Sequence, residues 1–138
     1  LPEFRRLLEL HFRERWGPGA FADDVIAVMD AAGVEQAILI GHSMGGVVTA
    51  WYASRLGGHT HIRRLITLGT PWKGTRMHIW GPGRETADLA PDSAVIEQIQ
   101  QPPLPVTAVW SPADQLIVPS DGARCDASRC TTRTYGSL

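Results

Sequence analysis

The chain has 138 residues, of which 43% are hydrophobic and 20% are charged, and its formal net charge at pH 7 is −1. These values are typical of one soluble domain, and 13 basic against 14 acidic residues leave no surplus of positive charge to neutralise nucleic-acid phosphates. The apolar runs are also shorter than the roughly 18 residues that a transmembrane helix needs. We therefore expect a single domain over residues 1–138, with no nucleic-acid partner and no transmembrane segment.

The hydrophobic pattern in the first half of the chain predicts helices on either side of a strand. Apolar residues recur at helical spacing over residues 2–16 and again over residues 21–32. The short apolar run at residues 37–40 predicts a strand buried on both faces. Helical spacing returns at residues 47–56, where a pair of glycines follows.

The second half continues the alternation of strands and helices. Strands are predicted at residues 65–68 and 106–110, with a weaker one at residues 131–135. Residues 71–92 form an excursion rich in glycine and proline, and residues 93–101 predict a short helix with a serine as its N-cap. This order is typical of an α/β domain with a parallel sheet, right-handed crossovers and helices on both faces.

The segment Gly41-His42-Ser43-Met44-Gly45-Gly46 lies at the predicted junction of the first strand with the next helix and matches G-x-S-x-G. In that setting the motif is typical of a nucleophile elbow, a strained turn that projects a serine from the sheet. Small residues at 41 and 45 would let the strand and helix backbones pass closely. The amide of Met44, at the positive end of the helix dipole, would face a tetrahedral oxyanion. The alternative is a glycine-rich turn in which Ser43 is only an N-cap.

Three segments together resemble the α/β-hydrolases, and among them the bacterial lipases and related esterases. Residues 38–46 contain the elbow, residues 67–75 are similar to the lipase pattern T-L-G-T-P-x-x-G-T, and residues 111–119 are similar to the turn S-x-x-D-x-x-V-P that carries the catalytic acid. The resemblance implies a partial α/β-hydrolase fold. It also implies that Ser43 is the nucleophile, Asp114 the acid of the catalytic triad, and the Met44 amide an oxyanion donor.

The histidine of such a triad is not where the family has it. In this fold the chain order is serine, acid, histidine, whereas all five histidines precede Asp114: His11, His42, His59, His61 and His78. We therefore expect the base to follow Leu138, and the first strands of the family's sheet, with the second oxyanion amide, to precede Leu1. Without those strands, residues 38–40 would form an apolar, unpaired edge of the sheet.

Three residues near the nucleophile are candidates for substrate binding: His42, Pro71 and Trp72. Ordinary packing explains Trp72 equally well. His78 could be a substitute base, although an exposed loop is the simpler interpretation. No group of residues offers the three or four ligands of a zinc site, so we expect neither a metal ion nor a cofactor.

Cys125 and Cys130 are too few for a disulfide scaffold, but they could close a six-residue loop. A bridge would favour a secreted or cell-envelope protein over a cytoplasmic one.

The sequence therefore predicts a hydrolase of carboxylic esters, of the lipase or esterase type, that forms an acyl-enzyme on Ser43 and acts on an ester or lipid substrate. A deacylase of lipid headgroups is one alternative. The other is a catalytically incomplete fragment or a non-catalytic interaction domain, which the absence of a histidine after Asp114 favours. The oligomeric state and the acyl-chain and alcohol specificity do not follow from these patterns.

Overall fold

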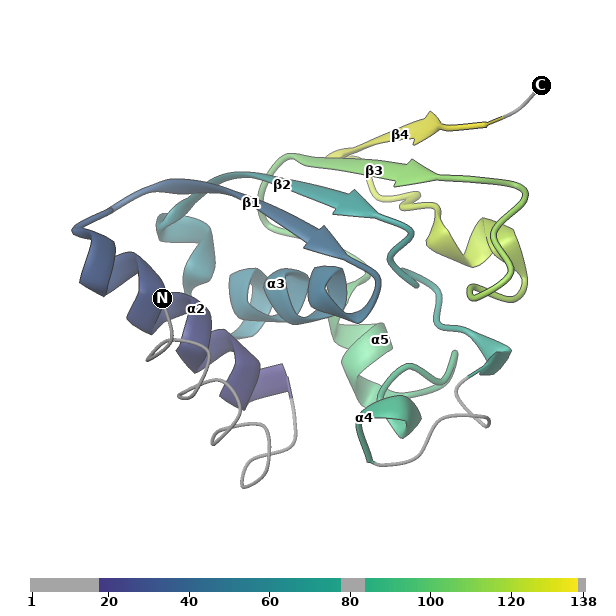
Figure 1. Cartoon of the computed structure of the whole chain (residues 1–138), viewed down its shortest axis with the longest axis horizontal. Coiled ribbons are helices and arrows are strands. Elements are labelled where there is room, and N and C mark those ends of the chain that lie inside the picture. The colour runs from purple at the N-terminus through teal and green to yellow at the C-terminus, as the bar shows by residue number, and fades with distance from the viewer. Residues whose placement is uncertain (1–17, 78–83, 137–138) are drawn as a thin grey trace, which may run out of the picture.

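The computed structural model describes residues 18–77 and 84–136. A parallel four-stranded sheet, with strand order β1-β2-β3-β4, forms one layer of the molecule, and helices form the other (Figure 1). The strands are β1 (Ala37–His42), β2 (Ile62–Leu68), β3 (Val106–Trp110) and β4 (Cys130–Thr134). The helices are α2 (Pro18–Ala32), α3 (Met44–Arg55), α4 (Arg84–Ala87) and α5 (Ala94–Ile99), with short 3-10 helices η1 (Gly58–Thr60) and η3 (Ser120–Ala123). The predicted parallel α/β architecture is confirmed.

The predicted elements correspond closely to the observed ones. Each predicted strand forms, and β3 has the predicted bounds. The N-cap of α5 is Ser93, whose hydroxyl accepts a hydrogen bond from the amide of Ile96 at 3.1 Å. The pattern does not predict α4, a single turn within the glycine- and proline-rich excursion, and the helix predicted at residues 2–16 lies outside the described residues.

The core lies between the sheet and α3. This helix is buried over most of its surface because it packs against β1 and β2 on one side and against α2 and α5 on its flanks. Alternate strand residues such as Leu65, Val106 and Ala108 point into the same layer and are at most 1% exposed. Sheet, α3 and the flanking helices therefore share one apolar core.

The other face of the sheet has no helix on it within the described ranges (Figure 1). On β1, Ile38 and Ile40 are 59% and 66% exposed, while Leu39 between them packs against the core. The expectation that residues 37–40 are buried on both faces is therefore wrong for the described part of the chain. β1 is also an edge of the described sheet, so the predicted apolar edge is present. Among the described helices, none combines the length and apolar character needed to cross a membrane.

A disulfide joins Cys125 to Cys130, as the sequence allowed, with the two Cα atoms 5.8 Å apart. It closes the loop that leads from η3 into β4. Inside this loop, Asp126 pairs with the ammonium group of Lys73 at 2.6 Å. The loop after β2 is thereby tied to the segment between β3 and β4.

Candidate active site

Ser43 lies in the turn between β1 and α3, at the carboxyl edge of the sheet. Its backbone has φ 52° and ψ −126°, and it is the one non-glycine residue with positive φ in the described ranges. Such a conformation is strained for a residue with a side chain. The Ser43 amide donates to the carbonyl of Leu68 at 2.9 Å, which holds the turn against the end of β2. The Ser43 hydroxyl makes no capping bond to α3, so the side-chain N-cap alternative is not what the structure shows.

Glycine at two positions lets the turn pack closely. A Cβ atom on Gly41 would lie 2.4 Å from the Cα of Gly46, and a Cβ atom on Gly46 would lie 1.9 Å from the hydroxyl oxygen of Thr70. β1, α3 and the loop after β2 therefore meet where a side chain has no room. A Cβ atom on Gly45 would have no neighbouring atom within 4 Å, so the close approach predicted at residue 45 is made by Gly46 instead.

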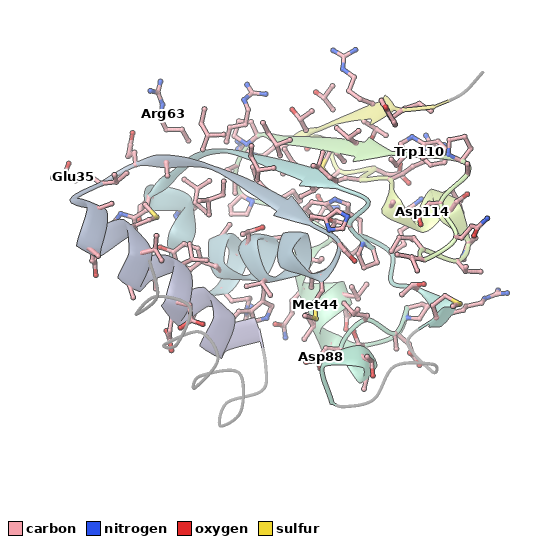
Figure 2. All side chains as sticks on the ribbon, in the orientation of Figure 1. Glu35, Met44, Arg63, Asp88, Trp110 and Asp114 are labelled. Carbon is pink, nitrogen blue, oxygen red and sulfur yellow. A yellow bond between two sulfur atoms is a disulfide. The ribbon has the colours of Figure 1, made fainter. Side chains whose placement is uncertain are left out.

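Met44 is the first residue of α3, so its amide is among those at the helix start that have no acceptor within the helix. The helix dipole places partial positive charge at the same point. Figure 2 shows Met44 toward the same end of the molecule as Asp114, whereas Glu35, which precedes β1, lies at the opposite end. An amide in this position can donate to an oxyanion that forms next to Ser43.

Asp114 lies in the turn that follows β3 and has one carboxylate oxygen already engaged. Its Oδ1 accepts hydrogen bonds from the amides of Leu116 at 2.8 Å and Ile117 at 3.0 Å. Its Oδ2 lies over Gly69, where an added Cβ atom would be 3.2 Å away. Gly69 follows β2, which lies between β1 and β3. Oδ2 is therefore on the side of Asp114 that faces β2 and, beyond it, β1 and Ser43. The carboxylate is oriented through one oxygen and can accept a further donor through the other.

Thr75, which the sequence analysis did not single out, connects this acid turn to the loop after β2. Its hydroxyl donates to the carbonyl of Leu116 at 3.1 Å and accepts from the amide of Val118 at 3.0 Å. The residue is 4% exposed. Its sequence signal is its place as the final threonine of the lipase-like segment at residues 67–75. The two lipase-like segments are thus joined to each other in space.

The histidines do not complete a triad within the described residues. His42 directly precedes Ser43 and is exposed. His59 lies in η1 and His61 directly precedes β2, so the whole of that seven-residue strand, about 23 Å, separates them from the carboxyl edge. His11 and His78 lie outside the described residues. In the described ranges, His42 is therefore the one histidine at the edge where Ser43 and Asp114 stand.

Of the three residues considered for substrate binding, His42 is exposed, whereas Pro71 and Trp72 are fully buried. Trp72 is 1% exposed and belongs to the hydrophobic core, where its indole N–H donates to the hydroxyl of Thr67 at 3.0 Å. The packing alternative accounts for Trp72, and neither buried side chain is open to a ligand in this conformation. Both shape the loop that carries Thr70 and Thr75.

A family model for the alpha/beta hydrolase fold matches residues 10–93. Among solved structures, the chain is similar to the meta-cleavage product hydrolase of Pseudomonas fluorescens IP01, with a TM-score of 0.71, 14% identity, and coverage of 90% of this chain and 65% of that one. It is also similar to a hydrolase from Pseudomonas aeruginosa PA01 (TM-score 0.62, 15% identity, 87% and 64% coverage) and to the mature lipase of Bacillus licheniformis (TM-score 0.56, 16% identity, 68% and 46% coverage).

The chain spans 64% and 65% of the length of the two Pseudomonas hydrolases. No curated protein sequence matches it. The structural similarity, at these identities, concerns the fold, and the family model covers more than half of the residues. The chain belongs to the α/β-hydrolase family.

Proposed function

We propose that the chain carries the nucleophile, one oxyanion donor and the acid of a serine hydrolase that cleaves carboxylic esters, of the lipase or esterase type. The observation that carries the proposal is the backbone of Ser43, with φ 52° in a turn between strand and helix. A serine that holds a strained conformation and makes no capping bond is explained by a nucleophile elbow. The lipase-like segment at residues 67–75 supports an ester as the substrate.

In the proposed reaction, Ser43 Oγ forms a bond to the ester carbonyl carbon while a histidine takes the hydroxyl proton. The carbonyl oxygen becomes an oxyanion and accepts a hydrogen bond from the Met44 amide. The histidine then gives its proton to the departing alcohol oxygen as the carbon–oxygen bond breaks. Water, activated by the same histidine, releases the acid from the acyl-enzyme and restores Ser43.

Asp114 orients the histidine and stabilises its protonated form. Its Oδ2 is the oxygen for this contact, because Oδ1 is held by the amides of Leu116 and Ile117. This arrangement fixes the carboxylate before the reaction begins. We place the histidine after Leu138, since the chain order of the family requires it to follow the acid.

A catalytically incomplete domain is the second candidate. It is favoured by one observation: His42, the histidine at this edge in the described part of the chain, is adjacent to Ser43 in sequence and lies on the strand side of the turn. A lipid-headgroup deacylase would use the same residues and differs only in the alcohol that leaves.

The test compares p-nitrophenyl butyrate hydrolysis by the 138-residue chain with that by a longer polypeptide that adds sequence at both ends and a histidine after Leu138. Each is paired with its Ser43→Ala variant, and folding is verified by a cooperative thermal melt. We expect the 138-residue chain to be no faster than Ser43→Ala, because a triad without its base keeps little activity. We expect the longer polypeptide to lose at least about 10³-fold on Ser43→Ala.

Three results would each contradict a different part of the proposal. If the longer polypeptide hydrolyses the ester equally well with Ser43→Ala, Ser43 is not the nucleophile. If the 138-residue chain shows turnover that depends on Ser43, the base lies within these residues, and His42→Gln and His78→Gln variants will identify it. Hydrolysis of a p-nitroanilide at a comparable rate would move the substrate class from esters to amides.

A further inference from the structure

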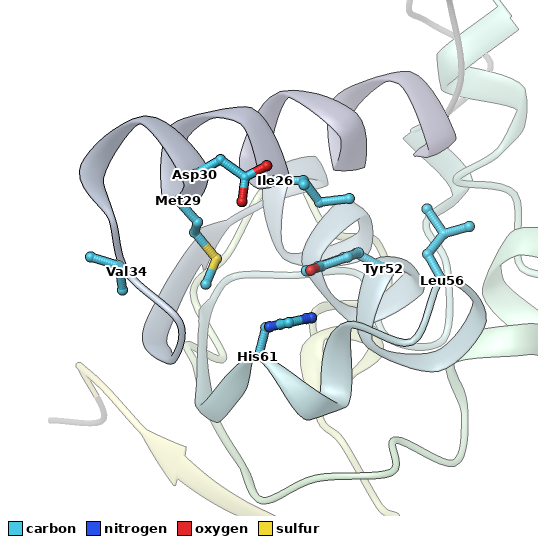
Figure 3. Close-up of a pocket in the computed structure, with 7 residues that line it drawn as sticks. All are labelled: Ile26, Met29, Asp30, Val34, Tyr52, Leu56 and His61. Atoms are coloured by element: carbon cyan, nitrogen blue, oxygen red, sulfur yellow. The ribbon is translucent and has the colours of Figure 1, made fainter.

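A cavity of about 140 Å³ lies at the other end of the molecule from Ser43, between α2, α3 and the segments that lead into β1 and β2 (Figure 3). His61, one of its lining residues, directly precedes β2. Ser43 follows the carboxyl end of β1, whereas the cavity lies at the amino ends of the strands, so the two sites are at opposite ends of the strands. Nothing in the proposed ester hydrolysis uses this cavity.

Four aliphatic or thioether side chains make up most of the wall: Ile26, Met29, Val34 and Leu56. Met29 is 8% exposed, whereas Val34 and Leu56 are 41% and 43% exposed and stand where the cavity meets solvent. An engineered apolar cavity of similar volume holds a molecule the size of benzene. The space therefore suits a ligand with a small, compact apolar body.

Tyr52 places a polar group inside this apolar wall. The residue is 2% exposed, and its hydroxyl points to the side of the cavity on which Met29 and Asp30 lie (Figure 3). The hydroxyl is not among the buried polar atoms that lack a partner in the described ranges, so it is accessible from the cavity and open to a ligand there. Burial and the negative charge of Asp30 raise the pKa of Tyr52, so the phenol stays neutral.

The remaining polar groups of the cavity are acceptors. His61 Nδ1 lies 3.1 Å from the carbonyl oxygen of Glu35. A carbonyl oxygen only accepts, so Nδ1 carries the hydrogen in this contact, and Nε2 is the ring position at which the imidazole can accept. Asp30 contributes a carboxylate, and no lysine or arginine lines the cavity in the described part of the chain. The site therefore offers several acceptors, one negative charge and a single hydroxyl donor.

We propose that this cavity binds a small primary ammonium ion with a compact apolar tail, whose N–H groups donate to Asp30, Tyr52 and His61. An ammonium group has three donors and no acceptor, which matches the acceptors that the site presents. Its charge complements the Asp30 carboxylate, whereas a carboxylate ligand would be repelled by it. The tail fills the space beside Ile26 and Met29.

The test uses three molecules of nearly equal shape and different charge: isobutylammonium, isobutanol and isobutyrate. Each is titrated at pH 7.5 and constant ionic strength into the ¹⁵N-labelled 138-residue chain, and amide chemical shifts are followed by NMR. We expect saturable shifts around Met29, Tyr52 and His61 with isobutylammonium, at least tenfold weaker binding of isobutanol, and no saturation with isobutyrate.

Variants then assign the binding to the cavity. Asp30→Asn should weaken isobutylammonium binding at least tenfold, and Leu56→Lys, at the exposed rim, should abolish it by charge repulsion without changing the core. Asp23→Asn, an exposed acid on the same helix that does not line the cavity, is the matched control and should leave the affinity unchanged. Equal binding of isobutanol and isobutylammonium, no saturable shift, or equal effects of Asp23→Asn and Asp30→Asn would each overturn the proposal.

Discussion

At the residue scale, the elbow depends on a glycine that has no room for a methyl group. A Cβ atom on Gly46 would lie 1.9 Å from Thr70 Oγ1 and 2.8 Å from two carbons of the same side chain. Thr70 is fully buried and cannot move aside cheaply. We predict that Gly46→Ala lowers the free energy of unfolding by about 1–3 kcal/mol, as overpacking does elsewhere, measured by urea denaturation.

Gly45→Ala is the control for this prediction. Gly45 is exposed in the same helix and has nothing within 4 Å of an added Cβ atom. Alanine has the better helix propensity, so this change should stabilise by up to about 1 kcal/mol. If both substitutions had the same effect, the contact between Gly46 and Thr70 would not constrain the elbow.

Single residues were predictable from the sequence where a motif fixes their position. Ser43 and Asp114 each follow a strand within a recognisable pattern, and both stand at the carboxyl edge of the sheet. The bonds of Thr75 to the acid turn could not be predicted, because they join residues more than 40 positions apart. The burial of Trp72 could not be predicted either, since an aromatic residue in a loop can line a pocket or pack in a core.

At the scale of elements, Thr75 holds the acid turn against the loop after β2. Its hydroxyl bonds to Leu116 and Val118, on either side of the Ile117 amide that orients Asp114. We predict that Thr75→Val, which keeps the shape and removes the hydroxyl, lowers the free energy of unfolding by about 1–3 kcal/mol because buried backbone groups lose their partner. Thr75→Ser keeps the hydroxyl and should cost less. Chemical denaturation of both variants gives the comparison, and equal losses would mean that the methyl group matters rather than the hydrogen bonds.

The Lys73–Asp126 pair links the same loop to the disulfide-closed segment and makes stability depend on pH. The pKa of Asp126 is lowered, chiefly by its hydrogen bond to Lys73. A carboxyl group whose pKa is lower in the folded state stabilises the fold at pH values above its unfolded-state pKa of about 3.9. This contribution is lost as the pH falls through the folded-state pKa. The effect is small because both side chains are exposed, at 38% and 57%.

We therefore predict that Asp126→Asn is less stable than the parent at pH 6 and that the difference shrinks as the pH falls below the unfolded carboxyl pKa of about 3.9. Urea denaturation across this range measures it. Asp121→Asn, an exposed acid in η3, serves as the control. A difference that grows toward low pH would contradict the assignment of the stabilisation to this pair.

The elements themselves were largely predictable, because hydrophobic period and glycine or proline punctuation are local signals. The extension of β2 back to Ile62 was not, since Arg63 and Arg64 interrupt its apolar pattern and are accommodated as exposed residues. The helix α4 also escaped prediction, because it is a single turn in a segment rich in glycine and proline.

At the scale of the whole molecule, we expect the open sheet face and the β1 edge to promote self-association. Ile40 is 66% exposed on an edge strand that has no charged residue to discourage pairing. We predict that Ile40→Lys reduces self-association of the 138-residue chain, measured by sedimentation velocity over a range of concentrations. Leu116→Lys, at a site that is 67% exposed in the loop after β3, a strand that β2 separates from β1, is the control and should have little effect. Equal effects of both changes would indicate a general gain in solubility rather than a role for this edge.

The convergence of the site at one edge follows from the architecture rather than from any single motif. In a parallel sheet the carboxyl ends of the strands lie on one side, so a serine after β1 and an acid after β3 stand at the same edge, with β2 between their strands. The sequence order predicts this juxtaposition. The sequence order does not predict the orientation of the Asp114 carboxylate. That orientation depends on the backbone amides of the turn after β3 and on the absence of a side chain at Gly69.

The central claim is that Ser43 is the nucleophile, and covalent labelling tests it most directly. The polypeptide that includes a histidine after Leu138 is treated with a fluorophosphonate, which modifies an activated serine, and is then digested with trypsin. The peptide of residues 16–55 contains two serines, Ser43 and Ser54, which tandem mass spectrometry distinguishes. We predict one adduct per chain, on Ser43, that is absent in Ser43→Ala and forms much more slowly in Asp114→Asn. An adduct on another serine, or labelling that persists in Ser43→Ala, would contradict the account.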